Sequence, residues 1–299
     1  MPTNLNLDIT TTTTTRTTTE LERLEAGMDN LGTTPKQKPG LQSYFARLLS
    51  PLIAIAVIAI IWQIVTWMQL QPDYILPGPQ QVIEALRIQA EQGLLWQSAF
   101  NSIRRAGQGF IISILIATPI GLALGFYPKL RAIFGPILSG LQVLPSVAWV
   151  PAAIIWFGLS DATIFAVVLL GAVPSIANGL LAGMDQIPPI YLRAGQVMGA
   201  TGFSRTWRII LPAAWPGYLA GLEQGWAFAW RSLMAAELIA VSPALGPGLG
   251  QMLDTGRTLG DMALILGAIG MIMAVGILIE RLVFAPLRLR TLRIRGLVG

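Results

Sequence analysis

The stretch RAGQVMGATGFSRTWRIILP, residues 193–212, is a basic and glycine-rich interruption in a chain that is otherwise strongly apolar. It carries three arginines and three glycines, and it follows two prolines, which suit the first turn of a helix. Thr201 and Gly202 break the helical pattern, and a second basic stretch then leads into a long apolar segment. The pattern predicts a short helix in a polar loop between two apolar segments.

The composition indicates a membrane protein. Of the 299 residues, 54% are hydrophobic and only 12% are charged, whereas an ordinary soluble domain carries about 25% charged residues. Too few polar side chains remain to cover the surface of a globular protein. We therefore expect most of the chain to lie in a lipid bilayer.

Several kinds of chemistry are excluded or unsupported. The chain has no cysteine and no histidine, which excludes disulfides, haem ligation by histidine and His/Cys zinc sites. We expect no metal site and no cofactor. No G-x-S-x-G motif or matched acidic pair supports an enzyme. The net charge of +5 does not predict nucleic-acid binding, because no basic patch with interleaved aromatic residues accompanies it.

Apolar windows of about 20 residues, long enough to cross a bilayer, recur along the chain. They predict an all-α integral membrane fold with about six transmembrane helices in a domain covering residues 41–299. Residues 1–40, with their threonine tract, are expected to form a disordered cytoplasmic tail. The pattern LPGPQQVIEALRIQAEQG predicts a surface helix between the first two spans. The predicted spans cover about residues 48–68, 106–127, 133–157, 162–184, 213–241 and 262–284.

Positive charge is distributed unevenly over the predicted loops. Fifteen lysines and arginines fall on the side that holds both termini and residues 193–212, and four fall on the other side. Because Lys and Arg gather in cytoplasmic loops, both termini and residues 193–212 are expected to be cytoplasmic. Arg104 and Arg105 are exceptions, since they lie on the outer side directly before the second span.

Proline is concentrated in the third predicted span. Pro145 and Pro151 lie six residues apart in LQVLPSVAWVPAAIIWFG. A proline in a membrane helix leaves a carbonyl unpaired, which neighbouring helices or water must satisfy. The two prolines therefore suggest a bent helix that lines a pathway, while ordinary packing in a helical bundle remains the alternative.

The fifth predicted span contains three charged residues, Glu223, Arg231 and Glu237. On a helix they share a face of about 120°, and Trp226 and Trp230 lie at its flank. Charged side chains at membrane depth normally face a protein interior or a water-filled cavity. These residues form either structural ion pairs or part of a translocation path in which Arg231 attracts an anion. The candidate path residues are Glu223, Trp226, Trp230, Arg231, Glu237, Pro145 and Pro151.

The interruption at residues 193–212 resembles a cytoplasmic pattern of ABC importer permeases, the inner-membrane subunits of binding-protein-dependent importers. That pattern reads E-A-A-x-x-x-G, then nine residues, then I-x-L-P. Here Arg193-Ala194-Gly195, Gly199 and Ile209-Ile210-Leu211-Pro212 stand at the same spacing. Arg193 replaces the usual Glu, and Gly195 replaces the second Ala. Gly195 and Gly199 lie four apart, so on a helix they would form one bare strip.

The resemblance implies that this segment is a coupling helix, which docks in a groove on an ATP-hydrolysing subunit. The residues expected to contact the ATPase are Arg193, Ala194, Gly195, Gly199, Ile209, Leu211 and Pro212. The chain itself has no G-x-x-x-x-G-K-[ST] phosphate loop. ATP hydrolysis is therefore assigned to a separate subunit, and this chain is not expected to be an enzyme.

Other segments are similar to the nitrate, sulfonate, taurine and bicarbonate branch of the family. They are ILPGP at 75–79, LPSVAWVPAAIIWFG at 144–158 and WRSLMAAELIA at 230–240. Residues 277–296, ILIERLVFAPLRLRTLRIRG, look most like aliphatic sulfonate permeases. The resemblance implies a fold like that of type I ABC importer permeases and an aliphatic sulfonate as the solute. Nitrate, bicarbonate or taurine, or a self-sufficient secondary transporter, remain as alternatives.

The resemblance also implies partners and a location. We expect four kinds of partner: two ABC ATPase subunits, an extracytoplasmic solute-binding protein, a second permease copy in a homodimer, and the lipid bilayer. No nucleic acid is expected as a partner. The location would be the bacterial cytoplasmic (inner) membrane, with several crossings and both termini in the cytoplasm.

Overall fold

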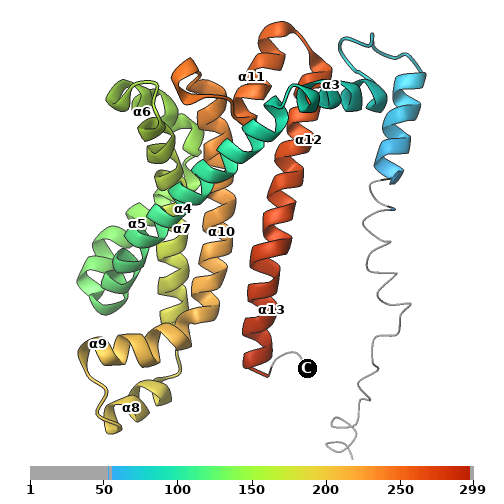
Figure 1. Ribbon diagram of the computed structural model, residues 1–299. Helices are drawn as coiled ribbons and strands as arrows, with labels where there is room; N and C mark the ends of the chain where they lie inside the picture. Colours follow the sequence, from blue (N-terminus) through green and yellow to red (C-terminus); the bar gives the residue numbers. More distant parts are fainter. Residues whose placement is uncertain (1–52, 54–55, 297–299) are drawn as a thin grey trace, which may run out of the picture. The chain divides into compact units, whose positions relative to one another are not determined.

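The computed structural model describes residue 53 and residues 56–296 (Figure 1). The predicted tail at 1–40 and part of the first predicted span at 48–68 lie outside the described residues. A short apolar helix, Ala56–Trp67, covers the end of that span. The chain divides into two units, Met1–Ile61 and Trp62–Gly299, and every element below belongs to the second.

The described part of the second unit is mostly helical and contains no strand. Segments Thr206–Ile210 and Glu280–Phe284 are single π-helical turns. The elements are α3 (Pro79–Glu91), α4 (Leu94–Phe126), α5 (Pro128–Val143), η1 (Ser146–Trp149), α6 (Val150–Phe157), α7 (Asp161–Asp185), α8 (Pro189–Val197), α9 (Gly202–Arg205), η2 (Thr206–Ile210), α10 (Leu211–Ile239), η3 (Pro243–Leu245), α11 (Leu249–Leu259), α12 (Met262–Ile279), η4 (Glu280–Phe284) and α13 (Ala285–Ile294).

Three helical stretches of the described chain are long and apolar enough to cross a membrane, or four if the bent pair of α5 with η1 and α6 counts as one span. The three are α4, α7 and the continuous stretch Met262–Ile294. They overlap the predicted spans at 106–127, 162–184 and 262–284. Helix α10 occupies the predicted fifth span but is less apolar, because it carries three charged residues. The full count of six spans stays a prediction.

The third predicted span is broken rather than merely bent. Helix α5 ends at Val143, and the η1–α6 pair starts at Ser146 with its axis turned by 98°. Leu144 is extended, with φ −73° and ψ 126°, as steric contact with the following proline ring demands. Pro145 offers no N–H to continue the helix. The predicted deviation at the prolines is confirmed at Pro145, while Pro151 lies in the first turn of α6.

Helix α4 begins earlier than the sequence predicts. It starts at Leu94, shortly after α3, which corresponds to the predicted surface helix, and Arg104 and Arg105 lie within α4. The helix therefore extends toward its N-terminus beyond the predicted span, which begins at about residue 106. The added turns of α4 bury polar side chains, including Ser98 and Ser102, so hydrophobicity alone does not mark them as part of this helix.

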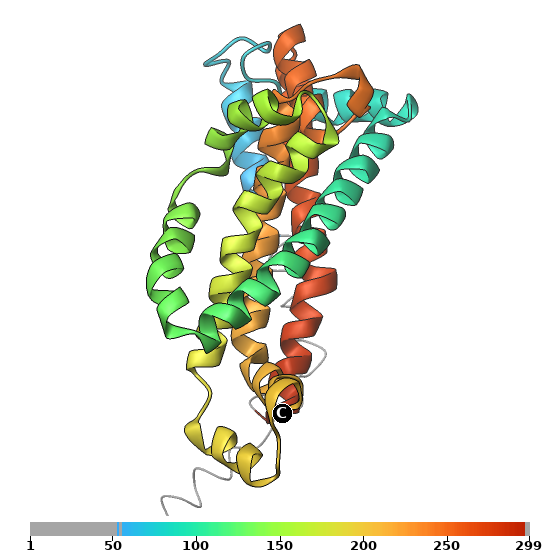
Figure 2. The ribbon, with the colours of Figure 1, turned by 90° about the vertical axis from the view of Figure 1, so that its left-hand side faces the viewer.

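Helix α7 is the central helix of the unit and lies beside α10 along most of its length (Figures 1 and 2). In its apolar window 61% of the residues are buried, compared with 28% in α4. Glycines allow α7 and α10 to approach closely. A Cβ atom at Gly179 or Gly217 would overlap the backbone of Gly221 or Gly183 on the facing helix. Backbone contact of this kind maximises van der Waals packing in lipid.

Candidate functional site: the coupling loop and the solute path

The stretch at 193–212 forms a helical hairpin beyond the ends of α7 and α10, at the opposite end of the unit from α6 and α11 (Figures 1 and 2). Helix α8 ends at Val197, and Gly199, two residues later, has φ +77°. The Gly199 N–H donates to the Gln196 carbonyl at 3.0 Å, and the Ala200 N–H donates to the Gly195 carbonyl at 2.9 Å. These two bonds form a Schellman motif, in which glycine is favoured because it adopts positive φ without strain.

The predicted bare strip of Gly195 and Gly199 is wrong. Gly199 has left the helix, so the two glycines do not share a face. Gly195 is buried and packs against Ile209, whose Cδ1 atom occupies the space that a Cβ would need. Gly195 therefore lets the second arm of the hairpin close on α8, rather than offering a bare surface to another protein.

The other predicted coupling residues lie on both arms of the hairpin. Arg193 and Ala194 are exposed on α8. Ile209 belongs to the π-helical turn η2, and Leu211 and Pro212 open α10. Ala194, Ile209 and Pro212 line one hollow of about 880 Å³ between α8, the start of α10 and α13.

The tip of the hairpin exposes large apolar side chains. Val197 is 89% exposed and Met198 is 77% exposed. Phe203 is 80% exposed and stacks on Trp207 with the ring centroids 6.1 Å apart. Contiguous exposed apolar side chains that are rimmed by polar residues mark a surface for contact with another protein.

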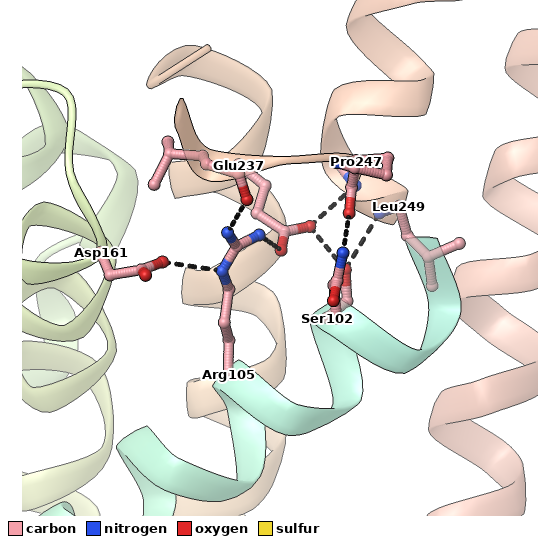
Figure 3. A network of polar contacts seen from close by, with 9 residues as sticks. Ser102, Arg105, Asp161, Glu237, Pro247 and Leu249 are labelled. Atoms are coloured by element: carbon pink, nitrogen blue, oxygen red, sulfur yellow. Dashed lines mark hydrogen bonds and ion pairs between the residues drawn. The ribbon is translucent and has the colours of Figure 1, made fainter. Parts of the chain in front are cut away.

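The three charged residues of α10 do not form one group. Glu237 is fully buried, and its carboxylate lies 3.1 Å from the guanidinium of Arg105 on α4 (Figure 3). Ser102 donates to the same carboxylate at 2.7 Å, and the Gly250 N–H donates at 3.1 Å. The Glu237 carboxylate therefore has three hydrogen-bonding partners within the protein.

Arg105 extends this network to two further segments (Figure 3). Its Nε atom lies 2.9 Å from a carboxylate oxygen of Asp161 at the start of α7, and its Nη2 atom donates to the Leu245 carbonyl. Ser102 accepts from the Leu249 N–H at 2.9 Å. The network joins α4, α7, α10 and the connection to α11. Sequence reasoning missed Arg105, although its place among the exceptions to the charge bias was a usable signal.

Glu223 and the two tryptophans also have partners inside the chain. A Glu223 oxygen lies 3.4 Å from the Arg288 guanidinium of α13. Trp226 and Trp230 are each only 7% exposed and stack with centroids 6.2 Å apart. Phe110 meets Trp226 edge-on at 5.3 Å. The structure places both tryptophans in the packed interior of the chain.

Arg231 differs from the other charged residues of α10. It is exposed, its Nε donates to the Ala227 carbonyl at 3.0 Å, and its guanidinium lies 4.7 Å from the Phe228 ring centroid. Among the described residues no carboxylate pairs with it. It lines a hollow of about 310 Å³ together with Gln142, Pro145 and Ser146. Pro145, at the break in the third predicted span, and Arg231 of α10 therefore line the same hollow. Pro151 does not line it.

Amide side chains next to this hollow form a polar chain. Gln142 donates to the Ser175 hydroxyl at 3.0 Å, and Asn178 donates to the Gln142 side-chain oxygen at 3.0 Å. Asn178 also lines a second hollow of about 500 Å³ with Arg131 and Ser139. Across residues 53 and 56–296, no group of three or more His, Cys, Asp or Glu side chains could hold a metal ion.

Comparison with known proteins identifies the family. Residues 109–285 match the family of binding-protein-dependent transport system inner membrane components. The chain is 34% identical to the taurine transport system permease protein TauC of Escherichia coli, over 71% of this chain and 80% of that protein. It is 28% identical to the bicarbonate transport system permease protein CmpB of Synechococcus elongatus, over 79% of this chain and 87% of that protein.

A third relative is the putative aliphatic sulfonates transport permease protein SsuC of Bacillus subtilis, which is 27% identical over 71% of this chain and 76% of that protein. All three relatives are named as transport permeases rather than as enzymes. Membership of such a transport system implies ATPase and solute-binding-protein partners and a membrane location. The chain belongs to this family and is an ABC importer permease of the nitrate, sulfonate, taurine and bicarbonate branch.

Proposed function

We propose that this chain carries a small organic anion, an aliphatic sulfonate, along a path that Arg231 lines. The observation that carries the proposal is the exposed guanidinium of Arg231 beside the break at Pro145. A charged side chain at membrane depth normally faces a water-filled cavity or a partner. The planar fork of arginine offers two donors to two oxygens of a sulfonate. Nitrate, bicarbonate and taurine are the competing solutes.

One face of α5 suggests how the path continues. Arg131, Gly135, Ser139 and Gln142 are separated by four, four and three residues, so they lie along one face of the helix. The first three line the hollow that Asn178 also lines, and Gln142 lines the hollow with Arg231. Arg131 is neutralised by a bidentate pair with Asp185, with both distances 2.7 Å. Among the described residues that line the two hollows, Arg231 is therefore the cation without a paired carboxylate.

A second copy of the chain would close the path, as a homodimer. Both hollows are open on the surface of a single chain, and Arg231 is exposed there. Two ATPase subunits would dock on the two α8–α9 hairpins from the cytoplasm, and a solute-binding protein would dock on the opposite side. The charge bias of the loops supports this orientation, with both termini in the cytoplasm.

Replacing Arg231 with alanine is expected to lower uptake of ethanesulfonate by about tenfold or more, since charge-assisted hydrogen bonds contribute about 1.5–3 kcal/mol. Uptake is measured in proteoliposomes that hold the complete complex and its binding protein. Arg257→Ala removes an exposed arginine paired with Asp254 on α11 and serves as the matched control. Unchanged uptake in Arg231→Ala would overturn the role of Arg231. Uptake of nitrate or bicarbonate, but not ethanesulfonate, by the native complex would overturn the solute.

Replacing Val197 with aspartate is expected to weaken binding of the ATPase subunits by about tenfold or more, because it places a charge in the apolar docking surface. Val197 is 89% exposed, so folding of the permease should change little. Co-purification of the ATPase measures the effect, and Gln196→Asp on the same helix is the control. Full ATPase retention in Val197→Asp would argue against docking there. A self-sufficient secondary transporter would transport normally in this variant.

A further inference from the structure

The start of α10 is short of backbone hydrogen bonds. Pro212 and Pro216 both lie in its first turns and have no N–H to donate. The carbonyl of Pro212 therefore cannot accept a bond from residue 216, where an ordinary helix would supply one. The preceding turn, Thr206–Ile210, is π-helical, with the Leu211 N–H bonded to the Thr206 carbonyl. The junction between η2 and α10 therefore has fewer regular i to i−4 backbone hydrogen bonds than an uninterrupted α-helix.

Arg295, at the end of α13, supplies the missing donor. Its Nη2 atom donates to the Pro212 carbonyl at 2.8 Å and to the Ala213 carbonyl at 3.1 Å. No carboxylate of the described chain pairs with this guanidinium. A charged donor on a backbone carbonyl makes a stronger bond than a neutral one.

Two other side chains of α13 contact α10 from the same face. The Trp215 indole N–H donates to the Thr291 hydroxyl at 3.0 Å, and Arg288 pairs with Glu223 at 3.4 Å. Residues 288, 291 and 295 are spaced three and four apart, as one helical face requires. The first half of α10 is therefore joined to α13 at three successive turns.

Helix α8 is connected to this junction through few contacts. Gly195 packs on Ile209, and a hollow of about 880 Å³ separates the rest of α8 from the start of α10 and from α13. A displacement of α8 can therefore pass through η2 into the first turn of α10, besides the direct chain connection from α8 to α7 at residues 186–188. We propose that Arg295 is a positioning residue that makes the coupling loop, the start of α10 and α13 move as one body when the ATPases close. This inference rests on the proposed docking of α8 on an ATPase.

The first test is an alanine substitution at Arg295 in the complete complex with ATPases and binding protein. Arg295→Ala is expected to lower the ratio of ethanesulfonate transported to ATP hydrolysed by about tenfold, while the ATPases remain bound and active. Arg293→Ala, which removes an exposed neighbour without a described side-chain hydrogen bond, should leave the ratio unchanged. Arg295→Lys, which keeps a charged donor, should restore most of it. An unchanged ratio in Arg295→Ala would overturn the proposal, as would loss of assembly in that variant.

The second test does not depend on the solute. Because the chain has no cysteine, spin labels attach to each permease copy only at introduced cysteines, here Gln196→Cys on α8 and Ile294→Cys on α13, both exposed positions. The distance between the labels, measured by electron–electron double resonance, should be the same in the nucleotide-free and the vanadate-trapped complex. In Arg295→Ala the two states should differ. A distance that changes equally with and without Arg295 would overturn the role of Arg295. Full ATPase retention in Val197→Asp would instead count against the docking of α8, so the two failures can be told apart.

Discussion

Replacing Arg105 with alanine is expected to destabilise the protein by about 3–5 kcal/mol, because the substitution leaves a buried carboxylate without its counter-charge. Glu237 is fully buried, and Arg105 is the only cation that pairs with it in the described chain. The same substitution removes the donor to the Leu245 carbonyl. The midpoint of thermal unfolding in detergent, compared with that of the native chain, measures the loss.

Arg104→Ala is the matched control, since Arg104 is exposed beside Arg105 and should contribute within about 0.5 kcal/mol. The double variant Arg105→Ala/Glu237→Ala should be less destabilised than the sum of the two single variants, because removal of both charges leaves neither one unpaired. Strict additivity of the two effects would contradict a direct interaction between these side chains.

Replacing Gly179 with alanine is expected to destabilise the protein by about 3 kcal/mol, at the upper end of the usual cost of overpacking. The new methyl group would overlap backbone atoms of Gly221, and a backbone cannot move aside as the end of a flexible side chain can. A Cβ at Gly221 would likewise lie 2.7 Å from the Gly179 Cα. Helices α7 and α10 would have to separate along their shared length.

Gly270→Ala on α12 provides a control with the opposite sign. Open space surrounds the position of its Cβ, so alanine should stabilise the helix by up to about 1 kcal/mol through its higher helix propensity. Thermal unfolding of both variants in the same detergent compares them directly. A stabilised Gly179→Ala would show that α7 and α10 do not touch through their backbones.

The long apolar elements could be predicted closely from the sequence. The span predicted at 162–184 is helix α7, Asp161–Asp185, because uninterrupted hydrophobicity marks both of its ends. A bend at Pro145 was foreseen because a proline ring acts on its nearest neighbours in the chain, whereas the structure breaks the helix there. The family could be recognised because the Gly199 and I-x-L-P positions have a fixed spacing, which does not depend on tertiary contacts.

The partners of the charged residues could not be predicted in the same way. A helical wheel shows that Glu223, Arg231 and Glu237 share a side of α10, but not which helices pack against that side. Arg105 lies 132 residues before its partner Glu237, and no local pattern links the two. The position of Gly199 was missed for a different reason. The sequence pattern predicted a helix that continues through Gly199, whereas α8 ends at Val197 and Gly199 has a positive φ.

The network around Arg105 also has a consequence for the order in which the chain is synthesised. At a translation rate of roughly 5–20 residues per second, Glu237 leaves the ribosome roughly 7–26 seconds after Arg105, from which it is separated by 132 positions. Asp161 follows Arg105 by only 56 positions and is half-exposed, so it is the earlier counter-charge. An unpaired arginine is costly inside lipid. We therefore expect the start of α4 to reach its final position only after α10 has been inserted and Glu237 completes the site.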